Sequence, residues 1–193
     1  MKLVNPVAAG LLELIPQDEL SLKLSYGCSE LEPDSLCFYE NYIPIRELVP
    51  KNFTIVDCGC YQGAQCYYFK DHKAYYGIDN FDSRGNASIR YIPPLRFYAD
   101  NTVHWVDRIQ NFLGTYKPNL YLPPDETYFI CSAVPDFEAT ELVYNTFPNV
   151  AVFYPGQQPN VKGIHADGIV RRQQELRDIL YGKGCAERFE VHR

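Results

Sequence analysis

The segment Thr54–Gly63 constrains the fold of this chain more than any other stretch. It begins with a short run of β-branched residues, typical of a buried strand, and then gives an acidic residue and two glycines in one turn: Asp57, Gly59 and Gly63. Glycine lets a backbone take positive φ and approach a ligand closely, and the turn leads into a helix predicted over Ala64–Lys70. Open α/β sheets bind ligands outside the carboxyl ends of their strands. The segment therefore predicts a strand, a ligand-binding turn and a helix.

From Phe53 onward, apolar runs alternate with helical patterns, as in a parallel sheet flanked by helices. The predicted strands are Phe53–Asp57, Ala74–Asp79, Arg96–Ala99, Thr127–Ser132 and Val150–Tyr154, with a final edge strand over Arg188–His192. The further predicted helices are Val103–Phe112, Glu138–Phe147 and Gly168–Tyr181. Turn-forming residues predict a loop over Pro155–Gly163.

Residues 1–50 are predicted to be a lead-in rather than a separate domain. They hold one short helical pattern, Ala8–Leu14, and Pro33 and Pro44 interrupt the rest. A chain of 193 residues has the size of one domain. We therefore expect a single domain over 1–193, with its core over 51–193.

A second carboxylate, Asp79, closes the next predicted strand. An acidic residue about 20 positions after the first strand holds ribose hydroxyls in dinucleotide-binding folds. A structural turn at Gly63 and a capping role for Asp79 are the simpler alternatives. A nicotinamide or flavin site is disfavoured, because its glycine pattern needs glycine where Tyr61 and Ala64 stand. The sequence holds no glycine-lysine-serine/threonine run, which excludes a P-loop.

These residues resemble the first motif of class I methyltransferases that use S-adenosyl-L-methionine (SAM). That motif has an acidic residue, any residue and a glycine, then another glycine four positions later, as at Asp57, Gly59 and Gly63. Tyr61 stands where many members have a middle glycine. The resemblance implies an α/β, three-layer Rossmann-like fold with a mostly parallel sheet of order 3-2-1-4-5, helices on both faces and room for a trimmed sixth strand.

The same resemblance implies a set of cofactor-binding residues around the strand ends. They are Asp57, Gly59, Cys60, Tyr61, Gly63, Asp79, Asn80, Phe81 and Asp100. By resemblance, the two glycines pass close to the methionine part and Asp57 lies near its ammonium group. Asp79 would hold the ribose, and Asn80 or Phe81 would flank the adenine. Asp100 would contact the adenine, although a helix N-cap is an equal interpretation of that residue.

Catalytic residues are not identified by the sequence, and Asp136 and His165 are weak candidates for a base. Asp136 precedes a predicted helix, so capping is its simpler role. His165 follows the fifth predicted strand in a loop, where chemistry is often placed. His104 is more simply a satisfied histidine. The segment Cys131–Asp136 lacks the Asn/Asp-Pro-Pro-aromatic sequence of enzymes that methylate nucleic-acid amino groups, which disfavours that substrate class.

Composition narrows the partners and the compartment. The net charge of −6 makes nucleic acid an unfavourable partner. Seven cysteines without regular spacing fit a reduced, cytoplasmic protein, and those nearest the glycine turn, Cys58, Cys60 and Cys66, lack the spacing of a metal site. No signal peptide or membrane span is recognisable, so we expect a soluble chain without a membrane partner. A homo-oligomer stays open.

The sequence therefore favours a SAM-dependent methyltransferase of unknown acceptor, with a small molecule or protein preferred over nucleic acid. After Tyr154 there is room for only one helix and one short strand, whereas family members have more, so the acceptor pocket would be open or completed by a partner. A noncatalytic methyltransferase-like domain that binds a nucleotide ligand or a protein is the alternative.

Overall fold

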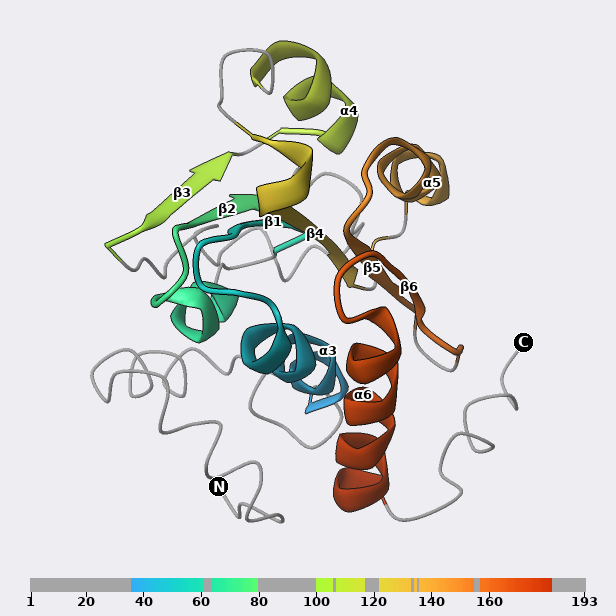
Figure 1. The fold of residues 1–193 in the computed structure, drawn as a ribbon. Coiled ribbons are helices and arrows are strands. Elements are labelled where there is room, and N and C mark those ends of the chain that lie inside the picture. Colours follow the sequence, from blue (N-terminus) through green and yellow to red (C-terminus); the bar gives the residue numbers. More distant parts are fainter. Residues whose placement is uncertain are drawn as a thin grey trace, which may run out of the picture.

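A computed structural model describes residues 36–60, 64–79, 100–105, 107–116, 122–132, 134, 136–154 and 157–181. These residues form a six-stranded sheet of order β3-β2-β1-β4-β5-β6 (Figure 1). The strands are β1 Thr54–Cys58, β2 Ala74–Ile78, β3 Thr102–Trp105, β4 Thr127–Ser132, β5 Val150–Phe153 and β6 Asn160–Lys162. All neighbours are parallel except β6, which is antiparallel to β5. The predicted order 3-2-1-4-5 and the mostly parallel sheet are confirmed.

Helices cover both faces of this sheet, which gives three layers (Figure 1). On one face lie α3 (Leu36–Leu48) and α6 (Ala166–Tyr181), and on the other lie α4 (Ile109–Asn111) and α5 (Phe137–Thr146). Helix α4 continues into a π-helical turn over Phe112–Tyr116. The predicted helices Glu138–Phe147 and Gly168–Tyr181 are confirmed as α5 and α6. Two short 3₁₀ helices, η3 (Ala64–Phe69) and η8 (Pro124–Glu126), precede β2 and β4.

Two hydrophobic clusters, one on each face, fix which way each strand side chain points. Ile55 of β1 belongs to the cluster under α3 and α6, whereas Val56 and Cys58 belong to the cluster under α4 and α5. Because side chains alternate along a strand, Asp57 must face the α3 side together with Ile55. All five residues of β1 are buried, as expected for a central parallel strand.

The third strand differs from its prediction. The neighbour of β2 is Thr102–Trp105, so a helix over Val103–Phe112 is wrong in its first half, and helix α4 begins only at Ile109. The prediction of a strand over Arg96–Ala99 lies outside the described residues. Threonine, valine and tryptophan are all favoured in strands, and pairing with β2 outweighs the helical spacing of this short segment.

The sixth strand also lies elsewhere than predicted. It is Asn160–Lys162, inside the stretch that was predicted to be a loop, and it pairs with β5 in the register Val150 to Lys162. The predicted edge strand Arg188–His192 lies outside the described residues. A three-residue strand is too short to give a periodic signal, so only its pairing with β5 reveals it.

Helix α3 was not predicted from the sequence, although it belongs to the core. It contains Pro44, which lacks the N–H for a helical hydrogen bond to the carbonyl four residues earlier. Burial of Tyr42 and Ile45, which are 1% and 0% exposed, offsets that loss. The predicted lead-in thus includes α3, one of the helices that cover a face of the sheet. The predicted helix Ala8–Leu14 lies outside the described residues.

None of the helices that the structure describes is long and apolar enough to cross a membrane.

Candidate functional site

The turn after β1 is tied to the end of β2. The backbone N–H groups of Gly59 and Cys60 both donate to the carbonyl of Ile78, at 2.7 and 3.1 Å. Gly59 has φ 84°, and a Cβ there would lie 2.9 Å from Cγ2 of Val134. Only glycine meets both conditions without strain. The positive φ expected of the glycines in this turn is confirmed at Gly59, while Tyr61 and Gly63 lie outside the described residues.

Asp57 is fully buried and held by two tyrosine hydroxyls. Tyr75 of β2 donates to Oδ2 at 2.6 Å, and Tyr42 of α3 donates to Oδ1 at 3.1 Å. Burial raises the pKa of Asp57 to about 7, the two hydroxyls oppose that rise, and the nearby Asp79 adds to it. Within the described residues, Asp57 forms no ion pair. The acidic residue of the predicted turn is therefore part of the protein interior.

Cys60 lies beside the imidazole of His104 over the backbone of β2. Its Sγ is 3.9 Å from Nδ1 of His104. Both side chains occupy the space above Gly77, where an added Cβ would collide with the imidazole and with the thiol. The structure thus requires a glycine at position 77, for which the sequence predicts no role.

Asp79 is buried at the carboxyl end of β2, and its backbone N–H donates to the carbonyl of Trp105 at 3.1 Å. The ends of β1, β2 and β3 are therefore joined through backbone hydrogen bonds. The structure brings Asp57, Gly59, Cys60 and Asp79 to one edge of the sheet. Asn80 and Phe81 lie outside the described residues.

Asp100 lies at the other edge. It precedes β3, whose residue Thr102 pairs with Tyr75 near the start of β2, so Asp100 is at the amino end of the strands and is exposed. Its predicted position after the third strand was wrong because that strand was placed too early. The acidic residue that follows β3 is Asp107, which the sequence analysis missed. It accepts hydrogen bonds from the N–H of Arg108 at 2.7 Å and from Nδ2 of Asn111 at 2.8 Å.

His165 is also separated from the glycine turn. It is exposed, has φ 57°, and lies in the turn between β6 and α6. Because β6 runs antiparallel and ends opposite Val150, the first residue of β5, the following turn lies at the amino edge of the parallel strands. The structure therefore does not bring His165 together with Asp57 and Asp79.

Asp136 caps helix α5, as its simpler interpretation predicts. Its Oδ1 accepts from the N–H of Ala139 and its Oδ2 from Nε2 of Gln110, both at 2.9 Å. The bond from Ala139 and the bond from Gln110 lower the pKa of Asp136. A carboxylate with both oxygens bonded and a lowered pKa is a poor proton acceptor at neutral pH.

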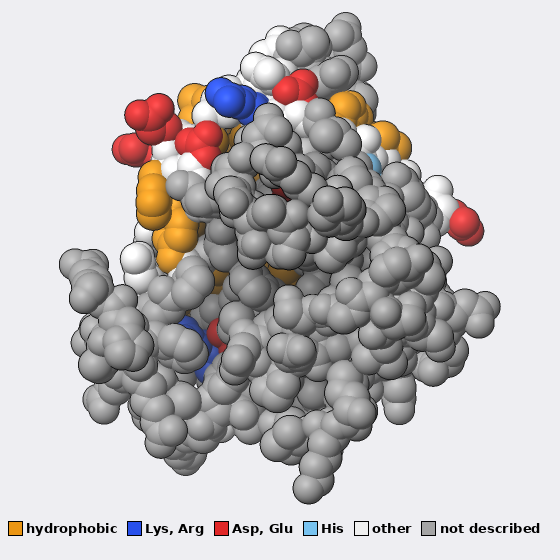
Figure 2. Space-filling model, turned by 180° about the vertical axis from the view of Figure 1, so that it is seen from behind, with side chains coloured by type: hydrophobic (Ala, Val, Ile, Leu, Met, Phe, Trp, Pro, Cys, Tyr) orange, Lys and Arg blue, Asp and Glu red, His pale blue; other side chains and the backbone are white. Residues whose placement is uncertain are grey.

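Two aromatic side chains contact each other near the carboxyl ends of β4 and β5. Phe137 at the start of α5 and Tyr154 after β5 have ring centroids 5.2 Å apart. Phe137 is 65% exposed and Leu142 of the same helix is 45% exposed. Figure 2 shows hydrophobic and acidic side chains side by side on the part of the surface where α5 lies. This edge therefore carries apolar surface accessible from outside.

Among the residues that the structure describes, no three His, Cys, Asp or Glu side chains gather in the manner of a metal site. Cys58, Cys60 and Cys66 are buried thiols.

No protein-family model matches the chain, and no curated protein matches its sequence. Solved structures do match it, with low similarity. One is SMU.1697c of Streptococcus mutans, which is assigned as a methyltransferase and was crystallised with S-adenosylhomocysteine (SAH). It has a TM-score of 0.37 and 13% identity, and the match covers 63% of this chain and 71% of that protein. The plantazolicin methyltransferase BamL, also with SAH, has a TM-score of 0.38 and 14% identity over 70% of this chain and 50% of its own.

A protein of Anaeromyxobacter dehalogenans, assigned as a type II methyltransferase, has a TM-score of 0.35 and 19% identity over 57% of this chain and 44% of its own. The chain thus spans half or less of two of these three proteins. TM-scores this low carry no weight for function. The strand order and the side chains at the carboxyl edge remain the basis for assigning a function.

Proposed function

We propose that the chain binds SAM at the carboxyl ends of β1 and β2 and transfers its methyl group to a small molecule or a protein. One observation supports this most directly: the Gly59 turn and Asp79 meet where the strand order reverses. The chain goes from β1 outward to β2 and β3, and then returns to β4 on the other side of β1. Open α/β sheets bind ligands at such a switch point.

The residues at this edge fit the cofactor. Gly59 leaves its turn free of a side chain, and Asp79 offers a carboxylate to ribose hydroxyls. Above its pKa of about 7, Asp57 supplies a buried negative charge that forms no ion pair within the described residues, and SAM carries an ammonium and a sulfonium. Tyr61, Gly63, Asn80 and Phe81 would complete the contacts, and Asp107 takes the adenine-side position first assigned to Asp100.

When bound, SAM supplies the methyl group on a sulfonium, so that the chain's own task is to hold and orient the reactants. The apolar surface of Phe137 and Tyr154 lies beside the ends of β4 and β5, where we place the acceptor. Asp136 orients Gln110 and caps α5 rather than taking a proton.

Thermal unfolding with SAM, SAH and NAD tests the binding step. A ligand at about 100 times its dissociation constant adds about 2.7 kcal/mol to stability. We expect a shift with SAM and SAH, a small one or none with NAD, and loss of the shift in Asp79→Ala. Asp125→Ala is the matched control, because Asp125 is an exposed carboxylate in η8. A folded sample that shifts with neither SAM nor SAH contradicts the proposal.

A noncatalytic, ligand-binding domain is the second candidate, since both oxygens of Asp136 are occupied by hydrogen bonds. The two candidates differ in one measurement, the transfer of label from methyl-labelled SAM to a mixture of small molecules and proteins. Binding together with label transfer supports the enzyme. Binding with no transfer to any fraction supports the second candidate.

A further inference from the structure

A series of hydrogen-bonded, buried polar side chains lies between the sheet and the helices α3 and α6. Gln173 of α6 donates to Asn41 of α3 at 2.8 Å, and Asn41 donates to the hydroxyl of Ser132 in β4 at 2.9 Å. Beside them, the hydroxyls of Tyr42 and Tyr75 donate to Asp57 at 3.1 and 2.6 Å. The surrounding residues form the hydrophobic cluster of this face, so these polar groups lie in an apolar setting.

Such an arrangement is expensive for stability. Burying a carboxylate without a cationic partner costs free energy, and hydroxyl donors recover only part of it. An apolar residue at position 57 would fill the same space without that cost. The carboxylate and its two hydroxyl donors therefore require an explanation other than packing.

We infer that Tyr42 and Tyr75 are positioning residues of the proposed SAM site, which hold Asp57 as a carboxylate beneath the Gly59 turn. This inference rests on the proposed function. Each tyrosine bonds a different oxygen of Asp57, so the pair fixes the plane of the carboxylate. Hydroxyl donors favour the ionised form yet leave its charge in place, whereas an arginine or lysine would cancel that charge. In a low dielectric, this charge attracts a cationic ligand that binds at the turn around Gly59, two residues after Asp57.

Tyr42 also makes helix α3 part of the site. Two carboxyl–guanidinium contacts hold α3 against α6, Glu40 with Arg177 at 3.3 Å and Glu47 with Arg172 at 2.9 Å, although burial raises the pKa of Glu40 to about 8. The hydroxyl of Tyr42 thus reaches Asp57 from a helix that is held by α6 as well as by the sheet. Burial raises the pKa of Tyr42 and of Tyr75 well above its ordinary value, so both remain donors at neutral pH.

Apart from His104, the other groups around Asp57 either oppose its ionisation or are neutral. Asp79 at the end of β2 raises the pKa of Asp57. The thiols of Cys58 and Cys60 lie in β1 and its turn, and His104 of β3 contacts the ring of Tyr75 edge-on, with centroids 5.9 Å apart. From β4 and α6 come the neutral side chains Ser132 and Gln173. The tyrosine hydroxyls are thus the groups hydrogen-bonded to Asp57 that favour its carboxylate form.

Calorimetric titration of the full chain tests this inference over about pH 5 to 7.5, below the range in which a free α-amino group titrates. The probes are SAM, SAH and 5′-methylthioadenosine, which lacks the ammonium. For wild type, the affinity for SAM and SAH should fall as the pH drops below about 7, the pKa of Asp57, while that for methylthioadenosine stays level. Tyr75→Phe should move this fall and its midpoint upward by about one pH unit, so that the affinity of the variant for SAM is still rising at the upper end of the titrated range, and Tyr42→Phe should move it by less.

Tyr128→Phe is the matched control. Tyr128 belongs to the same cluster, and among the described residues its buried hydroxyl has no hydrogen-bond partner. Its replacement should leave the midpoint unchanged. A structural role alone would lower the stability of the Tyr42 and Tyr75 variants without moving the midpoint, and that result overturns the inference.

Two further outcomes are informative. If wild type binds neither SAM nor SAH, the proposed function fails first, and the inference fails with it. If the tyrosine variants do not fold, wild type and Asp57→Asn are compared through their binding enthalpies at pH 7 in buffers of different ionisation enthalpy. Binding a cation should then release about half a proton from Asp57, and Asp57→Asn should abolish the release. No proton release from wild type overturns the inference.

Discussion

Replacing Asp57 with asparagine should stabilise the chain at high pH while leaving its stability at low pH nearly unchanged. The pKa of Asp57 is about 7 in the folded chain against an ordinary value of 3.8. Between these values the folded chain binds more protons than the unfolded chain, so this residue makes stability fall as the pH rises through that window. At about 1.36 kcal/mol per pH unit, the full cost above pH 7 is about 4 kcal/mol.

Relaxation around the carboxylate reduces this figure, and we expect Asp57→Asn to gain about 2 kcal/mol at pH 8. The amide oxygen can still accept one tyrosine hydroxyl, and its NH₂ group can donate to the other. Urea unfolding followed by circular dichroism at about pH 3.5 and pH 8 gives both free energies. The exposed Asp125→Asn should change neither. An asparagine variant that is less stable than wild type at pH 8, or shifted equally at both pH values, would refute the reasoning.

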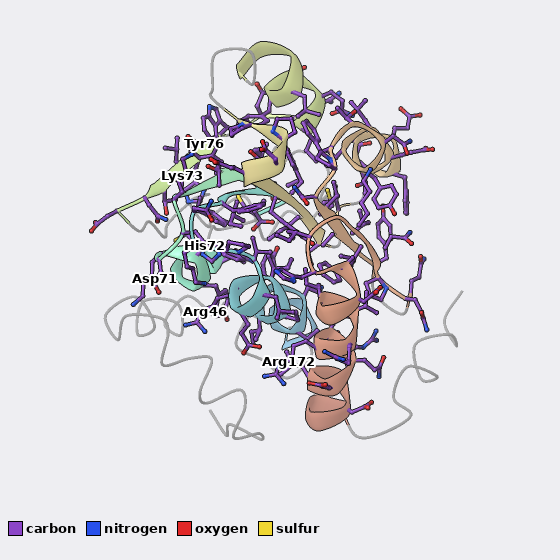
Figure 3. All side chains as sticks on the ribbon, viewed as in Figure 1. Arg46, Asp71, His72, Lys73, Tyr76 and Arg172 are labelled. Carbon is purple, nitrogen blue, oxygen red and sulfur yellow. The ribbon has the colours of Figure 1, made fainter. Side chains whose placement is uncertain are left out.

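Three further predictions concern the turn, the cap and a buried histidine. Gly59→Ala should cost about 1–3 kcal/mol in urea unfolding, because φ is 84° and Val134 is close; a smaller loss would mean that the turn relaxes. Asp136→Ala should cost about 1 kcal/mol through its lost bond to Ala139, and Asp136→Asn should retain most of that energy. His72 lies in the turn before β2 (Figure 3), and burial lowers its pKa to about 4. Stability should therefore fall as the pH drops from about 6.5 to 4, and His72→Phe should weaken that dependence by about 1–2 kcal/mol; an unchanged slope would contradict it.

The part of the site at the ends of β1 and β2 could be predicted from the sequence, because the patterns that specify it lie within short segments. The apolar run before Asp57 and the glycine two residues later specify a strand and a turn with positive φ, and the structure has both. Asp79 follows a second run of the same kind. Parallel pairing then places both residues at one edge, without any further information from the sequence.

The other parts depend on contacts between distant residues, which a local pattern does not show. Pro44 indicated an irregular segment, and only the burial of Tyr42 and Ile45 against the sheet explains why a helix forms there. Likewise, three residues of β6 reverse the chain and carry His165 to the edge opposite Gly59. The position of Asp107 after β3 could have been found, since the strand-favouring residues Thr102–Trp105 precede it directly.

The predicted gain in stability of Asp57→Asn and the affinity of that variant for SAM bear on each other. If a residue serves only packing, its replacement lowers the stability of the chain and weakens ligand binding only through that lower stability. If a buried residue serves through its charge, its neutral replacement has the opposite effect on stability: the variant is more stable at pH 8 but binds SAM more weakly. If Asp57→Asn gains stability and keeps its affinity for SAM, the buried charge is a cost without a use at this site. If stability rises and affinity falls together, the buried carboxylate of Asp57 lowers the stability of the free chain because it preorganises the site for a cationic ligand.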